Sequence, residues 1–172
     1  NQGAVFEAMN MASTWSLPVV FVIENNQYGM GTAISRTTSI DKLSKRALAF
    51  DMAHSEVDAM DVVKVFEHTN QIIKQMRKNP EPHLLEAHTY RYKGHSVSDP
   101  GNYRTKEEVK EYQKKDPIVQ LATLLKKKKL ATEEQLSDWD KQAKQQAKDD
   151  EKFADEAAEP QTAEAYEHVF AD

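Results

Sequence analysis

Residues 18–31, PVVFVIENNQYGMG, decide the fold of this chain, because a continuous apolar run ends there and polar, glycine-containing sequence follows. The run at 18–23 is rich in β-branched and aromatic residues, which is typical of a strand buried on both faces of a parallel sheet. In open parallel sheets, ligands bind at the carboxyl ends of the strands. Asn25 and Asn26 therefore stand where a cofactor site is expected, and the glycines after them leave backbone carbonyls accessible as oxygen ligands.

The same asparagine pair has a second interpretation. Asparagine tolerates left-handed backbone and hydrogen-bonds its own main chain, so Asn25 and Asn26 can also serve only to form a turn. Both interpretations are open on local sequence alone.

The composition limits the class of protein. The 172 residues suffice for one domain with a helical extension. With 30% charged residues and a net charge of -5, the chain offers no general attraction for nucleic acid or an anionic membrane. The absence of cysteine excludes disulfides and thiolate metal sites and fits a reducing cytoplasm.

No apolar run approaches the roughly 20 residues that span a bilayer, and no signal peptide is recognisable. We therefore expect a soluble, cytoplasmic protein. The sequence opens at Asn1 without an initiator methionine, which suggests a piece of a longer protein.

Hydrophobic spacing predicts further elements on both sides of this strand. Asp61 is the expected N-cap of the longest of them, and the NPEP sequence at 79–82 ends it. The predicted elements are a helix at 3–16, a short helix at 43–50, a short strand within 54–60, a helix at 61–78 and a second strand at 83–92.

Polar loops follow both strands, and the composition changes after the second loop, at 93–104. From there the sequence is helical and strongly charged, with helix starts predicted at Thr105, Asp116 and Thr132 from two capping boxes and an Asp-Pro pair. We expect an α/β part at 1–104 and a helical C-terminal extension at 105–172, whose last helix reaches about Ala158.

His95 is the candidate reactive side chain of the second loop. Arg91, Lys93 and Arg104 place positive charge near it, which suits phosphate oxygens. A loop that is merely solvated has a similar composition, so the residues alone leave that alternative open.

The two loops together resemble one family. The matching stretches are NQG at 1–3, FEA at 6–8, ENNQYGMG at 24–31, YRYKGHSVSDP at 90–100 and YRT at 103–105. They resemble the alpha subunit of the thiamine diphosphate-dependent pyruvate dehydrogenase, the decarboxylating first component of its complex.

The resemblance implies a fold and a site. It implies a parallel sheet flanked by helices that holds thiamine diphosphate and Mg²⁺. Asn26 would bind the metal through its side-chain oxygen and Tyr28 through its backbone carbonyl, and both would be cofactor-binding residues. His95 would contact the diphosphate near the reacting centre and so be both cofactor-binding and catalytic, while Arg91 and Arg104 would support its loop.

The resemblance also implies partners and an activity. The chain would be the C-terminal half of an alpha subunit that decarboxylates pyruvate and passes the acetyl unit to a lipoyl group. Its partners would be a beta subunit, in a heterotetramer, and the lipoyl-bearing acyltransferase component. The family's Gly-Asp-Gly motif would fall before Asn1, so we expect these residues alone to be inactive.

Two other functions stay open. An acetoin or branched-chain 2-oxo acid dehydrogenase shares much of the loop sequence. A non-catalytic helical interaction module is the alternative of another class, and the charged C-terminal helices favour it.

Overall fold

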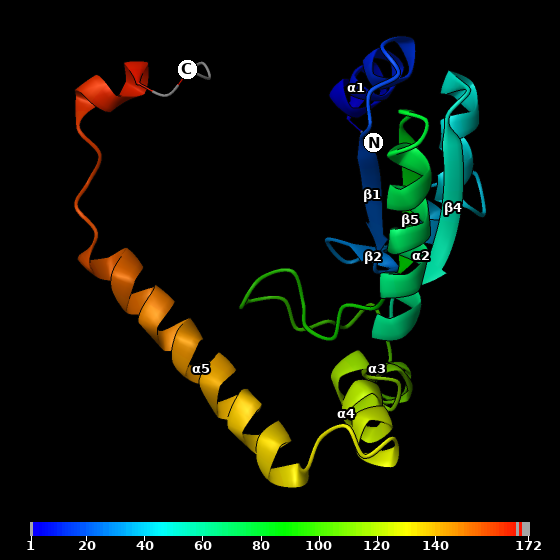
Figure 1. Ribbon diagram of the computed structural model, residues 1–172. Coiled ribbons are helices and arrows are strands. Elements are labelled where there is room, and N and C mark those ends of the chain that lie inside the picture. The colour runs from blue at the N-terminus through cyan, green and yellow to red at the C-terminus, as the bar shows by residue number, and fades with distance from the viewer. Residues whose placement is uncertain (1, 168, 170–172) are drawn as a thin grey trace. The chain divides into compact units, whose positions relative to one another are not determined.

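Three parallel strands, β1 (Val20–Asn25), β4 (Ala53–Asp58) and β5 (His83–His88), form one sheet in the order β1-β5-β4 (Figure 1). The computed structural model describes residues 2–167 and 169, so Asn1 of the first matching stretch lies outside the described residues. The chain forms two compact units, Asn1–Leu124 and Leu125–Asp172, and each is described by itself. The predicted division at 104/105 stays a prediction.

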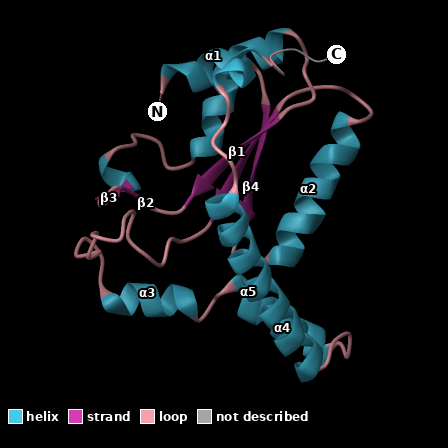
Figure 2. Cartoon of the chain, turned by 90° about the vertical axis from the view of Figure 1, so that its left-hand side faces the viewer, coloured by secondary structure: helices cyan, strands magenta, loops and turns pink. Residues whose placement is uncertain are grey.

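The two faces of the sheet are covered by different helices, because neighbouring side chains on a strand point to opposite faces. Leu84 of β5 packs with residues of α1 (Gly3–Thr14) and of the 3₁₀-helix η2 (Leu43–Phe50). Leu85 faces the other way and packs with α2 (Val62–Met76), which runs along the strands in Figure 2. The predicted α/β fold with a helix-flanked parallel sheet is confirmed.

Most predicted elements of the first unit are confirmed. The helix at 3–16 is α1, the strand within 54–60 is β4, and the strand expected at 83–92 is the shorter β5. Asp61 caps α2 as predicted, because its Oδ1 accepts hydrogen bonds from the backbone N–H groups of Val63 and Lys64. The helix at 43–50 forms with 3₁₀ rather than α geometry.

The prediction that the first strand is buried on both faces is wrong for one face. Val22 is 60% exposed. β1 stands at one edge of the described sheet, and α2 packs chiefly against β4 at the other edge. Phe21 and Ile23 pack against the cluster under α1 and η2. On the opposite face Val20 packs against the cluster under α2, while Val22 and Glu24 further along the strand are exposed.

A short hairpin, β2 (Tyr28–Gly29) and β3 (Thr32–Ala33), stands at the start of the predicted first loop, followed by a 3₁₀ turn, η1 (Ile34–Arg36). The sequence predicted only a polar loop here, so the hairpin is an addition to that prediction. Met30 (φ 45°) and Gly31 (φ 80°) are both left-handed. Left-handed backbone at both turn residues matches the right-handed twist of the two strands. The strands have two residues each, too few to show an alternating sequence pattern.

After the second polar loop, the helical segments are α3 (Lys106–Gln113), α4 (Pro117–Lys127), α5 (Glu133–Glu156) and the 3₁₀-helix η3 (Thr162–Tyr166). The three predicted starts are confirmed, and α5 ends two residues before the expected Ala158. Thr132 and Gln135 form the full reciprocal capping box. Among the described residues, no helix is long and apolar enough to cross a membrane.

Ile72→Ala tests the packing of α2. Ile72 is 4% exposed and contacts Val57 and Leu85. We expect the substitution to lower the free energy of unfolding by about 2–5 kcal/mol, because it opens a cavity. Urea denaturation measures the change. Phe66→Ala on the same helix is the control, since Phe66 is 69% exposed, and equal losses for the two variants would contradict the packing.

Candidate functional site

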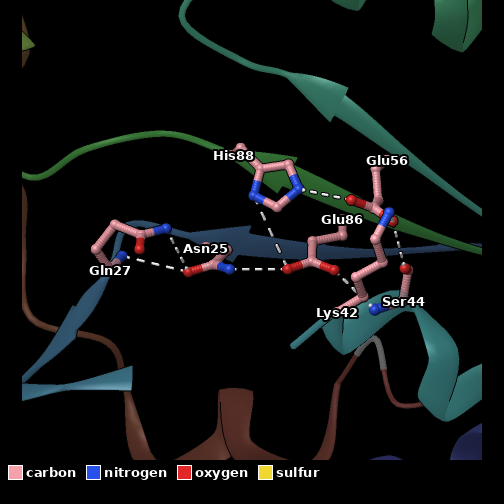
Figure 3. Close-up of polar contacts among 7 residues, drawn as sticks. All are labelled: Asn25, Gln27, Lys42, Ser44, Glu56, Glu86 and His88. Atoms are coloured by element: carbon pink, nitrogen blue, oxygen red, sulfur yellow. Dashed lines mark hydrogen bonds and ion pairs between the residues drawn. The ribbon is translucent and has the colours of Figure 1, made fainter. Parts of the chain in front are cut away.

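The carboxyl end of β1 is built on Asn25, which is buried. Its side-chain Nδ2 donates a hydrogen bond to Glu86 Oε1 on β5 at 2.8 Å. Its Oδ1 accepts from the backbone N–H of Gln27 at 3.3 Å and from Gln27 Nε2 at 3.2 Å (Figure 3). Asn25 is therefore a turn residue in the sense of the second sequence interpretation, and it is locked to the neighbouring strand.

Asn26 forms the next turn and is only half-buried. Its Oδ1 accepts a hydrogen bond from the backbone N–H of Tyr28 at 3.3 Å. Gln27, between the two turns, has a φ of 75°. The backbone thus bends sharply after β1. A carboxamide oxygen has two lone pairs, and the described residues supply a donor to only one lone pair of Asn26 Oδ1.

A cleft of about 670 Å³ opens beside this turn, between α1, β1, the first loop and η2. Both predicted metal-binding residues, Asn26 and Tyr28, line it. Phe6 and Phe21 supply apolar surface, and Arg46 of η2 supplies a positive charge. The two residues predicted to bind the cation therefore border one cavity.

His95 lies against the first loop and does not line that cleft. Its Nε2 accepts a hydrogen bond from the backbone N–H of Met30 at 3.1 Å. An accepting Nε2 is unprotonated, so the ring proton of the neutral imidazole sits on Nδ1. Nδ1 is buried, has no hydrogen-bond partner among the described residues, and lies 4.0 Å from Asp99 Oδ2. This contact joins the second polar loop to the first.

Asp99 holds the second loop in shape. Its carboxylate accepts hydrogen bonds from the backbone N–H groups of His95 and Gly101, both at 2.9 Å, and from Tyr103 Oη at 3.0 Å. The bonds from the main chain at His95 and Gly101 lower the pKa of Asp99. A Cβ at Gly94 would come within 2.6 Å of Asp99, so the loop closes here only around glycine.

Glu108 of α3 joins the first loop to the segment that leads from β5 into the second loop. Its Oε1 accepts hydrogen bonds from Tyr28 Oη at 2.9 Å and Tyr90 Oη at 2.8 Å. Burial and the bond to Glu108 raise the pKa of Tyr90 to about 12. Thr105 accepts from Glu108 N as predicted, but Glu108 does not complete the predicted capping box, because its carboxylate is engaged by the tyrosines.

Arg104 supports the second loop, as the resemblance implied. Its guanidinium donates to the backbone carbonyls of Arg91 and Tyr92. It also lies over the rings of three tyrosines, Tyr28, Tyr90 and Tyr103, at 5.3–5.8 Å from their centroids. Arg104 is thus used within the protein, and its charge is not directed at the cleft.

A group of ionisable residues on the sheet adjoins Asn25 (Figure 3). Ligand atoms of Glu56, Glu86 and His88 lie within 4.8 Å of one another. Lys42 Nζ already contacts Glu56 Oε1 at 2.8 Å and supplies a cation, and both oxygens of Glu86 accept hydrogen bonds. Lys42 and then His88 lower the pKa of Glu56. We assign no metal to this group.

Sequence reasoning did not single out Glu86 or Asp99, and it gave Glu108 a role only in the capping box of α3. Glu86 had a signal, because a carboxylate between Leu85 and Ala87 interrupts an apolar strand. Asp99 and Glu108 had none of their own, since an acidic residue in a polar loop or in the first turn of a helix is ordinary.

The sheet, the double turn after β1 and the cleft define an α/β domain with a cavity beside the carboxyl end of a parallel strand. Residues 1–163 match the model of one family, described as the dehydrogenase E1 component. The chain belongs to this dehydrogenase E1 component family.

Three relatives illustrate the similarity. The chain is 41% identical over 170 residues to the pyruvate dehydrogenase E1 component subunit alpha of Rickettsia felis, over 99% of this chain and 52% of that protein. It is 40% identical to the protein of the same name in Rhizobium meliloti, over 98% and 49%. It is 38% identical to the chloroplastic subunit alpha-3 of Oryza sativa, over 100% and 40%. The chain thus spans about half the length of the curated relatives it matches.

Asp99→Asn tests the second loop. Asn offers one acceptor oxygen where Asp99 uses two. We expect the backbone amides of His95 and Gly101 to exchange with solvent about tenfold faster, because the charged acceptor of both amides is replaced by a single neutral oxygen. Hydrogen exchange measures the two rates. Tyr103→Phe removes a single bond to Asp99 and is expected to have a smaller effect.

Acid is the matched test of the same contacts. The folded pKa of Asp99 lies below its ordinary value of 3.8. The protection it gives is therefore complete above pH 3.8 and is lost as the pH falls through the lower folded pKa. Protection that instead fades well above that range, in mildly acidic buffer, would contradict this role.

Proposed function

We propose that this segment is part of the alpha subunit of an acetyl-transferring pyruvate dehydrogenase and that its cleft receives thiamine diphosphate with Mg²⁺. The printed names of the relatives support the proposal, since proteins that align with nearly the whole chain at 38–41% identity are called pyruvate dehydrogenase E1 component subunit alpha.

The observation that carries the proposal is the Asn26 side-chain oxygen, fixed by the Tyr28 N–H at the border of the cleft. A preset oxygen with a free lone pair suits Mg²⁺, which binds through few protein oxygens together with waters and phosphate oxygens. Asn26 and the Tyr28 carbonyl would supply the protein oxygens of this chain. The residues present therefore fit part of a metal-diphosphate site.

His95 is proposed as the residue of the second loop that contacts the diphosphate. Its Nε2 bond to Met30 N would have to give way first, so the proposal requires the two loops to separate locally. This bond joins a backbone N–H to a neutral imidazole nitrogen at an exposed position, and one such hydrogen bond contributes about 0.5–1.5 kcal/mol.

The cofactor, when bound, supplies the carbanion chemistry that removes carbon dioxide from 2-oxo acids. This chain's part would be to orient the diphosphate through Asn26 and Tyr28 and to present His95 beside it. A beta subunit and a lipoyl-bearing acyltransferase component are the proposed partners, with a heterotetramer as the assembly. Placement in the cytoplasm stays a prediction.

Asn26→Ala in the full-length subunit, assembled with its beta partner, tests the site. We expect the dissociation constant for thiamine diphosphate at fixed Mg²⁺ to rise about tenfold or more, since a metal ligand and a turn acceptor are both lost. Quenching of intrinsic fluorescence measures binding. Asn10→Ala, on the exposed side of α1, is the control, and an unchanged constant for Asn26→Ala would refute the proposed role.

The 172 residues by themselves are expected to bind thiamine diphosphate weakly and to show no turnover. Two protein oxygens are too few to hold Mg²⁺ without a carboxylate. Isothermal titration calorimetry with and without Mg²⁺ tests this expectation. Tight, Mg²⁺-dependent binding by the segment alone would contradict it.

Substrate choice within the family is tested by turnover. We propose pyruvate, and comparison of pyruvate, acetoin and a branched-chain 2-oxo acid in the reconstituted complex distinguishes the rivals. The non-catalytic interaction module is supported by the exposed Trp139 and Phe153 of α5, which are 49% and 76% exposed. If the complex stays fully active without residues 133–156, Trp139 and Phe153 are not needed for catalysis, and a role in binding another protein is favoured for them.

A further inference from the structure

We infer that Glu86 is a positioning residue that fixes the turn presenting Asn26 to the cofactor. This inference rests on the proposed function, because it concerns how the same cleft is built. Glu86 has no exposed surface and is the one charged residue that is buried among the described residues. A carboxylate in such a place is costly unless its oxygens are satisfied.

Both oxygens of Glu86 are satisfied by donors. Oε1 accepts from Asn25 Nδ2 at 2.8 Å, and Oε2 accepts from the backbone N–H of Ser44 at 2.8 Å. Neither partner can accept in return at the atom concerned. The position therefore requires two acceptor oxygens, which a carboxylate has and a carboxamide lacks.

The bond to Glu86 decides how Asn25 is oriented. An amide has a donor end and an acceptor end, and Glu86 can receive only the donor end. Asn25 Oδ1 must then point away, toward Gln27, where it accepts from both the backbone and the side chain. The turn at Asn26 follows directly, so the placement of the proposed metal ligand depends on a residue that does not touch it.

The second bond reaches another wall of the cleft. Ser44 belongs to η2, and η2 also contributes Leu43 and Arg46 to the cleft lining. Glu86 thus ties two walls to β5 at once, one through Asn25 and the other through Ser44 (Figure 3). A residue that only filled the core would not hydrogen-bond to Asn25 and to Ser44.

Glu56 provides a matched control. It pairs with Glu86 in the register of β4 and β5, so it has the same chemistry on the same face of the sheet. Its carboxylate contacts Lys42, His88 and Ser44 Oγ rather than Asn25, and it is partly exposed. Its removal changes the local charge and leaves the turn alone.

The experiment compares Glu86→Gln, Glu56→Gln and the double substitution Glu86→Gln/Asn25→Asp, the swap, in the full-length subunit assembled with its beta partner. In the swap, the carboxamide placed on β5 donates to the carboxylate placed at the end of β1. The carboxamide oxygen still accepts from the backbone N–H of Ser44, so the net charge and the bonding pattern are retained.

Two quantities are measured for each variant. They are the dissociation constant for thiamine diphosphate at fixed Mg²⁺ and, separately, the melting temperature without cofactor. Binding is measured at a temperature where circular dichroism shows each variant folded.

We expect Glu86→Gln to raise the dissociation constant about tenfold, in the range that residues behind a metal ligand typically show. The swap is expected to return it to within about threefold of the unsubstituted enzyme, because the coupled change restores the pairing. Glu56→Gln is expected to leave it within about twofold, since a partly exposed ion pair contributes little.

Three outcomes overturn the inference. The first is a folded Glu86→Gln with unchanged binding. The second is a swap that regains the melting temperature without regaining affinity. The third is a swap that does not fold. If Glu86→Gln itself fails to fold, the swap alone decides.

Asn26→Ala separates this inference from the proposed function. If Asn26→Ala binds the cofactor as tightly as the unsubstituted enzyme, the proposed site is wrong. If Asn26→Ala binds weakly and Glu86→Gln does not, only the role of Glu86 is wrong.

Discussion

The architecture of the first unit depends on one buried carboxylate with two donor partners. Glu86 stands on the central strand of the sheet and receives hydrogen bonds from the strand on one side and from the helix that covers it. Its desolvation is a cost that only those bonds offset. Because that requirement allows one orientation of Asn25, the irregular backbone after β1 is fixed to the sheet through the Asn25 side chain.

Different interactions hold the segments next to the second loop in place. There the hydroxyls of Tyr28 and Tyr90 share Glu108 as acceptor, and Arg104 lies over both rings. Hydrogen bonds join Met30 to His95, 65 positions apart, and Tyr28 to Glu108, 80 positions apart. The first loop is therefore attached at two points, to the second loop through Met30 and His95 and to α3 through Tyr28 and Glu108.

Sequence reasoning reached the elements whose side chains repeat with a regular period. It located α1, β1, α2 and the helix starts, because apolar spacing and capping residues act over a few positions. It could not reach Glu86, whose partners come from β1 and η2, or the second role of Glu108, since those depend on register between distant strands and loops.

The two interpretations of the asparagine pair turned out to be compatible. Asn25 and Asn26 both form turns, and Asn26 still lines the cleft with an oxygen that has a free lone pair. Local sequence could not decide between them, because the orientation of Asn25 is imposed by a strand that lies 61 positions further along the chain.

The exposed side chain of Val22 has a consequence for handling the segment. β1 pairs with a neighbour on one side only among the described strands, so its other edge presents unpaired main-chain donors and acceptors. The sequence there, VVFVI, is uncharged, free of proline and strongly β-forming. This edge is therefore where self-association of the isolated segment is expected, and a charged residue in place of the exposed Val22 is the kind of substitution that opposes it.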